Sequence, residues 1–85
     1  MTARWLVEIT LDDLAARERV VRLAREGQCF GHVAIAAAVK RPDGVVAMIT
    51  MPTRLVAGEI RERVVEGVRK LTGVGDVMIR VTKAT

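Results

Sequence analysis

The sequence predicts a small α+β domain in which one β-α-β unit occurs twice. The pentapeptide RERVV stands at 17–21 and again at 61–65, which is 44 positions later. When residues 17–38 are aligned with residues 61–82, nine of the 22 positions are identical. Short stretches of alternating hydrophobicity flank both copies, as strands flank an amphipathic helix. We therefore interpret residues 1–85 as a single domain with an internal repeat at about 5–40 and 45–82.

The first unit contains a strand and a helix. Residues 4–11 alternate strictly and are rich in β-branched side chains, which predicts a strand. Asp12 or Asp13 is the candidate N-cap of the helix that follows. We expect this helix to run to about Glu26, because Gly27 can take the left-handed conformation that ends a helix.

The middle of the chain contains two strands and a turn. We predict strands at 32–39 and 45–51, joined by a hairpin turn at 41–44. The turn has the sequence Arg-Pro-Asp-Gly, in which proline presets φ and glycine takes a positive φ. Pro52 then ends the second of these strands, and Thr53 is the candidate N-cap of the second helix.

A final strand at 76–82 completes the order β-α-β-β-α-β. This is the order of a ferredoxin-like sandwich. Right-handed crossovers then give a four-stranded antiparallel sheet of order 4-1-3-2, with two helices on one face. The other face of the sheet is predicted to have no cover.

This uncovered face is predicted to be mostly apolar. By alternation we place on it Leu6, Glu8, Thr10, Ala34, Ala36, Ala38, Val46, Met48, Met78 and Arg80. The positions between them, including Ala37, Val45, Ala47 and Ile49, are predicted to face the helices. A solvated antiparallel face normally carries polar side chains, so an apolar one indicates contact with another molecule.

We expect a homo-oligomer or a protein partner to bind at this face. The predicted interface residues are Leu6, Ala36, Val46, Met48, Met78 and Arg80. Glu8 and Arg80 stand on neighbouring strands and are expected to pair across them. The alternative interpretation is that some apolar surface is normal for a folded protein and that the strand at 32–39 is simply rich in alanine.

Composition narrows the functional classes. No apolar run approaches the ~20 residues that span a bilayer, and a single cysteine excludes an internal disulfide, so we predict a cytoplasmic protein. The net charge of +4 comes largely from helices in which arginine and glutamate interleave. The only aromatic residues are Trp5 and Phe30, so stacking of bases on the sheet, and with it specific nucleic-acid binding, is not expected.

Cys29 and His32 are the only thiol and the only imidazole, and they lie three positions apart. Together they could supply one corner of a metal site, which needs three or four ligands, so a metal role stays open as an alternative. The chain has no serine, no tyrosine and no glycine-rich phosphate loop. We therefore predict no catalytic residue and no cofactor.

Residues 44–81 resemble the closing half of PaaD-like iron–sulfur assembly domains, with an alternating strand, an amphipathic helix, a GV-x-x-V turn and a final strand. Residues 28–33 stand where that family approaches its second strand. The family's Cys-Pro would fall near Arg54 and Leu55, where this chain has no thiol. The same half, with its Leu-Thr-Gly turn at 71–73, is similar to alkaline-shock envelope-stress domains, to the dimerisation domains of cation-diffusion transporters and to ACT- or AsnC-type effector domains.

The residues favour a non-catalytic interaction or assembly module that forms homo-oligomers through its open sheet. The resemblances imply two alternatives. One is a metal or iron–sulfur cluster assembly factor of the PaaD-like type. The other is a regulatory domain that binds a small ligand.

Overall fold

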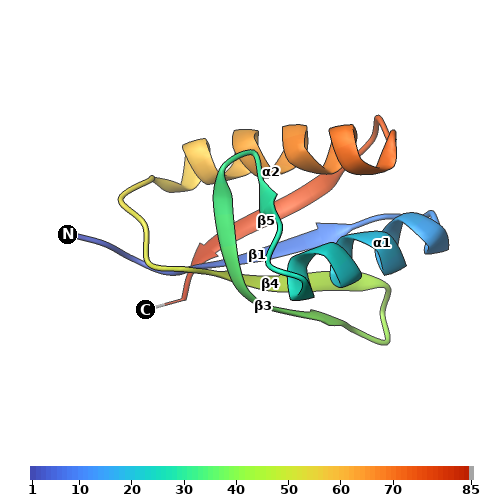
Figure 1. Cartoon of the computed structure of the whole chain (residues 1–85), viewed down its shortest axis with the longest axis horizontal. Helices are drawn as coiled ribbons and strands as arrows, with labels where there is room; N and C mark the ends of the chain where they lie inside the picture. The colour runs from blue at the N-terminus through green and yellow to red at the C-terminus, as the bar shows by residue number, and fades with distance from the viewer. Residues whose placement is uncertain (85) are drawn as a thin grey trace.

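Two helices lie against one face of an antiparallel sheet in the computed structural model of the chain, which describes residues 1–84 (Figure 1). The elements in chain order are β1 (Trp5–Thr10), α1 (Leu14–Arg25), β2 (Cys29–Phe30), β3 (Val33–Lys40), β4 (Val45–Thr50), α2 (Ala57–Thr72) and β5 (Met78–Lys83). The sheet has five strands in the order β2-β3-β4-β1-β5. Thr85, the last residue of the predicted domain, lies outside the described residues.

The α+β class, with two helices and an antiparallel sheet, is confirmed. The predicted four-stranded sheet of order 4-1-3-2 is wrong, because a fifth strand, β2, pairs with β3 at the edge of the sheet. Gly31 and His32 form the two-residue turn between these strands, with φ of +56° and +68°. Hairpin turns of this kind need positive φ at both central residues and usually have the sequence Asn-Gly or Asp-Gly. Gly-His lacks that signal, so the sequence did not indicate a hairpin.

The first helix and the β3–β4 turn form as predicted. The carboxylate of Asp13 accepts a hydrogen bond from the Ala16 N–H at 3.2 Å and caps α1. Gly27, with φ of +83°, follows the last turn of that helix. In the β3–β4 turn, Gly44 has φ of +86° and its N–H donates to the carbonyl of Arg41 at 3.1 Å. Local side-chain chemistry therefore sets these boundaries.

The predicted start of the second helix is wrong. The Thr53 hydroxyl accepts a hydrogen bond from the Leu55 N–H at 3.1 Å and so makes a turn rather than a cap. The helix begins at Ala57, after Val56. The Glu59 carboxylate accepts from the Val56 N–H at 3.2 Å, which satisfies a backbone donor at this end.

The core lies between the helices and the sheet, and both copies of RERVV contribute to it: Val20 and Val21 from the first, and Val64 from the second. Val20 in α1 and Val64 in α2 are the equivalent positions, and both are fully buried. Phe30, in the short strand β2, is also fully buried. The β2–β3 hairpin therefore closes over the core instead of lying on the surface.

Two glycines allow the hairpin to touch α2 directly. A Cβ atom on Gly67 of α2 would lie 2.6 Å from the backbone nitrogen of Gly31, and one on Gly31 would collide with the carbonyl oxygen of Arg63. No side chain fits between these backbones. The approach of α2 to β2 thus depends on glycine at both positions.

We predict that Gly67→Ala destabilises the fold, because the added methyl group has no space and overpacking costs about 2 kcal/mol. Urea unfolding followed by circular dichroism measures the change in the free energy of unfolding. Gly58→Ala is the matched control on the same helix, because nothing lies within 4 Å of its Cβ position. This variant should be unchanged or more stable, by up to about 1 kcal/mol. Equal stability of the two variants would contradict the backbone contact.

Candidate interaction face

The sheet face turned away from both helices is assembled from four strands. We call it the open face and define it by the outward-pointing residues Leu6, Glu8 and Thr10 of β1, Ala37 and Val39 of β3, Val45, Ala47 and Ile49 of β4, and Met78, Arg80 and Thr82 of β5. Met78 is 71% exposed and Val39 is 51% exposed. Most of these side chains are apolar, so the predicted apolar character of the face is present, although some of its residues differ.

The predicted placement of Val46 and Met48 on this face is wrong. Val46 lies opposite Ile9 and Met48 opposite Val7, and both are fully buried against the helices. Their neighbours Val45, Ala47 and Ile49, predicted to face inward, point outward instead. Every residue from 45 to 49 is apolar, so hydrophobic alternation did not distinguish the two faces of this strand.

Strand β3 changes face partway along its length. Its pairing with β4 shifts between Ile35 and Ala37, which marks a bulge. Beyond the shift, Ala37 lies opposite Ile49 on the open face, and Ala38 lies opposite Met48 and is 5% exposed. Both residues were predicted on the opposite faces. Ala36, a predicted interface residue, is exposed at the irregularity itself.

Leu6, Met78 and Arg80 do lie on the open face, as predicted. Strand β1 has polar residues at Glu8 and Thr10, so its two faces differ in polarity. On β5, the same contrast between polar and apolar positions allowed Arg80 to be placed on the open face. These three residues are the part of the predicted interface that the strands bring together on one surface.

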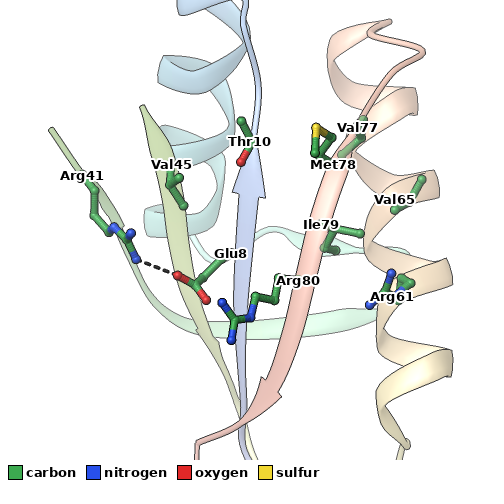
Figure 2. Close-up of a pocket in the computed structure, with 10 residues that line it drawn as sticks. All are labelled: Glu8, Thr10, Arg41, Val45, Arg61, Val65, Val77, Met78, Ile79 and Arg80. Atoms are coloured by element: carbon green, nitrogen blue, oxygen red, sulfur yellow. Dashed lines mark hydrogen bonds and ion pairs between the residues drawn. The ribbon is translucent and has the colours of Figure 1, made fainter. Parts of the chain in front are cut away.

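A charged cluster crosses the open face (Figure 2). Glu8 lies between Arg41 and Arg80, and its carboxylate accepts a hydrogen bond from the Arg41 Nη1 at 2.7 Å. The Nη2 of Arg41 donates to the Asp43 carboxylate, also at 2.7 Å. Arg80 is the cross-strand neighbour of Glu8, but the ion pair of Glu8 is with Arg41, not the predicted Arg80. The sequence indicated Arg41 only as a turn residue, and its ion pair with Glu8 on the open face was not predicted.

The ion pairs of this cluster shift the pKa values of Asp43 and Arg41 in the β3–β4 turn. The hydrogen bond from Arg41 lowers the pKa of Asp43 below its ordinary value, and a second one from the Val45 N–H, at 3.1 Å, acts in the same direction. The carboxylates of Asp43 and Glu8 in turn raise the pKa of Arg41. Within the strands and the β3–β4 turn, the open face thus has two carboxylates and two guanidinium groups and no net charge.

Cys29 and His32, the candidate metal ligands, lie on the hairpin that contacts α2. The Cys29 thiol is free and exposed, and His32 is exposed in the turn. Both line a groove of about 710 Å³ that α2 completes with Glu66 and Lys70. No group of three or more His, Cys, Asp or Glu side chains within residues 1–84 is arranged to hold a metal ion. This pair thus has no third ligand from the described part of its own chain.

Comparison of the chain with protein-family models, curated proteins and solved structures finds no match. The resemblances to the PaaD-like and other families remain predictions from the sequence. Among the described residues, neither helix is long and apolar enough to cross a membrane.

We predict that Asp43 titrates below the ordinary aspartate pKa of about 3.9. Because its pKa is lowered in the folded state, its contribution to stability is present above the unfolded pKa and is lost as the pH falls through the folded pKa. Carboxyl NMR titration measures the midpoint, which should rise in Arg41→Gln. Lys70→Gln, which removes an exposed ion pair on α2, is the control and should leave the midpoint unchanged. The same midpoint in wild type and Arg41→Gln would rule out Arg41 as the cause.

Proposed function

We propose that this chain is a non-catalytic interaction module that forms a homodimer by packing its open face against that of a second copy. One observation carries the proposal: the open face is mostly apolar, its strands and the β3–β4 turn have no net charge there, and no helix lies over it. Exposed apolar patches of this kind on small domains mark contacts with other proteins. A stable interface covers about 800 Å² on each partner, which requires much of the face of so small a sheet.

The charges of the open face favour a second copy of the same chain. A two-fold interface brings the same patch of both copies together, so a strongly charged patch would repel itself. Here Glu8 and Asp43 balance Arg41 and Arg80. In an antiparallel pairing of two faces, Arg80 of one copy can approach the carboxylates of the other.

The polar groups of the face support binding rather than chemistry. Its described residues include no His or Cys side chain, and Arg41 holds both carboxylates. General acid–base and nucleophilic catalysis both need a side chain free to exchange a proton or attack a substrate. The face offers apolar surface with charges that set orientation, which is what a recognition surface needs.

We predict that Val39→Asp and Met78→Asp each dissociate the dimer, because a carboxylate buried between two apolar sheets has no partner. The expected effect on self-association is at least about tenfold, or about 1.4 kcal/mol. Light scattering at a series of concentrations measures the mass, which should fall from twice that of one chain to that of one chain. A wild-type protein that stays monomeric throughout the series would refute the homodimer.

Two further variants separate loss of the interface from loss of the fold. Leu14→Asp places the same charge at a residue that is 61% exposed on α1, away from the open face, and should leave the dimer intact. Met48→Asp places it in the core, where the side chain is 0% exposed, and should unfold the domain. Circular dichroism distinguishes these outcomes. A folded monomer from Met48→Asp would contradict the placement of strand β4.

A further inference from the structure

Strand β5 presents a long strand edge that no other described strand pairs with. It spans six residues and pairs only with β1, without a register shift. The opposite edge is formed by the two-residue strand β2, which is folded against α2, and beyond Ala34 by β3 itself. That part of β3 has a bulge between Ile35 and Ala37, and its Ala38 carbonyl accepts a hydrogen bond from the Arg25 side chain at 3.2 Å. Natural proteins usually protect an edge with a bulge, a proline, a short strand or charged side chains. The β5 edge has none of the first three, and its charged side chains, Arg80 and Lys83, are both basic.

The pairing with β1 shows which backbone groups of β5 are free. The N–H of Ala84 donates to the carbonyl oxygen of Arg4 at 2.9 Å, so these two residues form a hydrogen-bonded pair. Such pairs alternate along antiparallel strands, so the N–H and C=O groups of Ile79, Val81 and Lys83 point away from β1. No backbone hydrogen bond from a turn or loop of residues 1–84 reaches them.

A groove of about 630 Å³ lies at β5 and extends from α2 across the open face as far as Val45 of β4. Figure 2 shows Arg61 and Val65 of α2 on the side of β5 opposite to β1, with Val77 and Ile79 beside them. The groove continues around β5 to Arg80 on the open face. An added strand would thus meet free backbone groups, an apolar wall from α2 and a basic rim.

The charge of this rim decides between possible occupants. Arg61 and Arg80 line the groove, and Lys83 lies at the end of the same strand edge. All three are exposed, and no carboxylate of residues 1–84 forms an ion pair with them. Glu8 also lines the groove, but it is paired with Arg41. A second copy placed edge to edge would bring the same cations against these, whereas an acidic strand would neutralise them.

We propose that the free edge of β5 binds an extended acidic segment of a partner protein by strand addition. Backbone hydrogen bonds to Ile79, Val81 and Lys83 hold the segment, and its alternate side chains meet Val65 or the basic rim. This role goes beyond self-association, because it uses the backbone edge of the sheet and not its open face.

The test uses a fluorescein-labelled peptide in which glutamate and valine alternate, with capped ends. Fluorescence anisotropy should show saturable binding that weakens as salt is raised. NMR should show slower hydrogen exchange at the Ile79 and Val81 amides with peptide bound, by about tenfold or more. The same peptide with alternate amides N-methylated should not bind, because it cannot form the ladder. Equal binding of the methylated peptide, or no binding of the first, overturns the proposal.

Variants of the chain locate the site. Val81→Pro removes an outward N–H without removing a hydrogen bond to β1, and should weaken binding about tenfold or more. Arg61→Glu should weaken it as well, while Arg22→Glu on the exposed side of α1 is the matched control and should not. If Val81→Pro fails to fold, the methylated peptide and Arg61→Glu still decide the question. Undiminished binding to Arg61→Glu counts against the basic rim.

The test also separates this proposal from the homodimer. Peptide binding that persists in monomeric Val39→Asp supports strand addition even if the open face forms no dimer. Protection of the Ile79 and Val81 amides in the wild-type dimer without peptide would mean that a second copy occupies the edge, and would overturn the proposal.

Discussion

The direct contact between the backbones of Gly31 and Gly67 determines how the sheet closes. Because neither residue has a side chain, the β2–β3 hairpin lies against α2, and Phe30 enters the core beneath it. Backbone approach of this kind is available only to glycine. The contact fixes β2, the short outer strand on one side of the sheet, against α2. The outer strand on the other side, β5, has six residues and no further strand beside it among the described elements.

Local chemistry decided which elements could be predicted. Asp13, Gly27 and the Pro-Asp-Gly turn act through their own side chains or dihedral angles, so their roles are visible in the sequence. Thr53 has the side chain of a cap but makes a turn, because its hydroxyl accepts from the Leu55 N–H and the helix begins only after Val56. Strand β2 is stabilised by its contact with α2 and not by a turn signal, so only the three-dimensional structure reveals it.

Which face each strand buries could be predicted only where the two faces differ in polarity. In β1, Glu8 and Thr10 alternate with apolar residues, and the prediction is correct. In β4 both faces are apolar, so the register with β1 decides, through Val7 opposite Met48. In β3 the shift after Ile35 exchanges the faces of a run of alanines. A bulge in a strand of uniform polarity does not change the hydrophobic pattern, so it cannot be detected from the sequence. The apolar character of the open face was therefore predicted correctly, but several of its residues were not.

The two halves of the repeat differ at the position that makes the closing contact. At the repeat offset Gly31 corresponds to Gly75, but Gly67 of α2 corresponds to Leu23 of α1. Nothing lies within 4 Å of a Cβ position on Gly75, so this glycine does not lie against α1 as Gly31 lies against α2. The second half also has no extra strand at its edge among the described residues. The RERVV copies supply equivalent core residues, while the outer strands of the sheet differ, β2 on one side and β5 on the other.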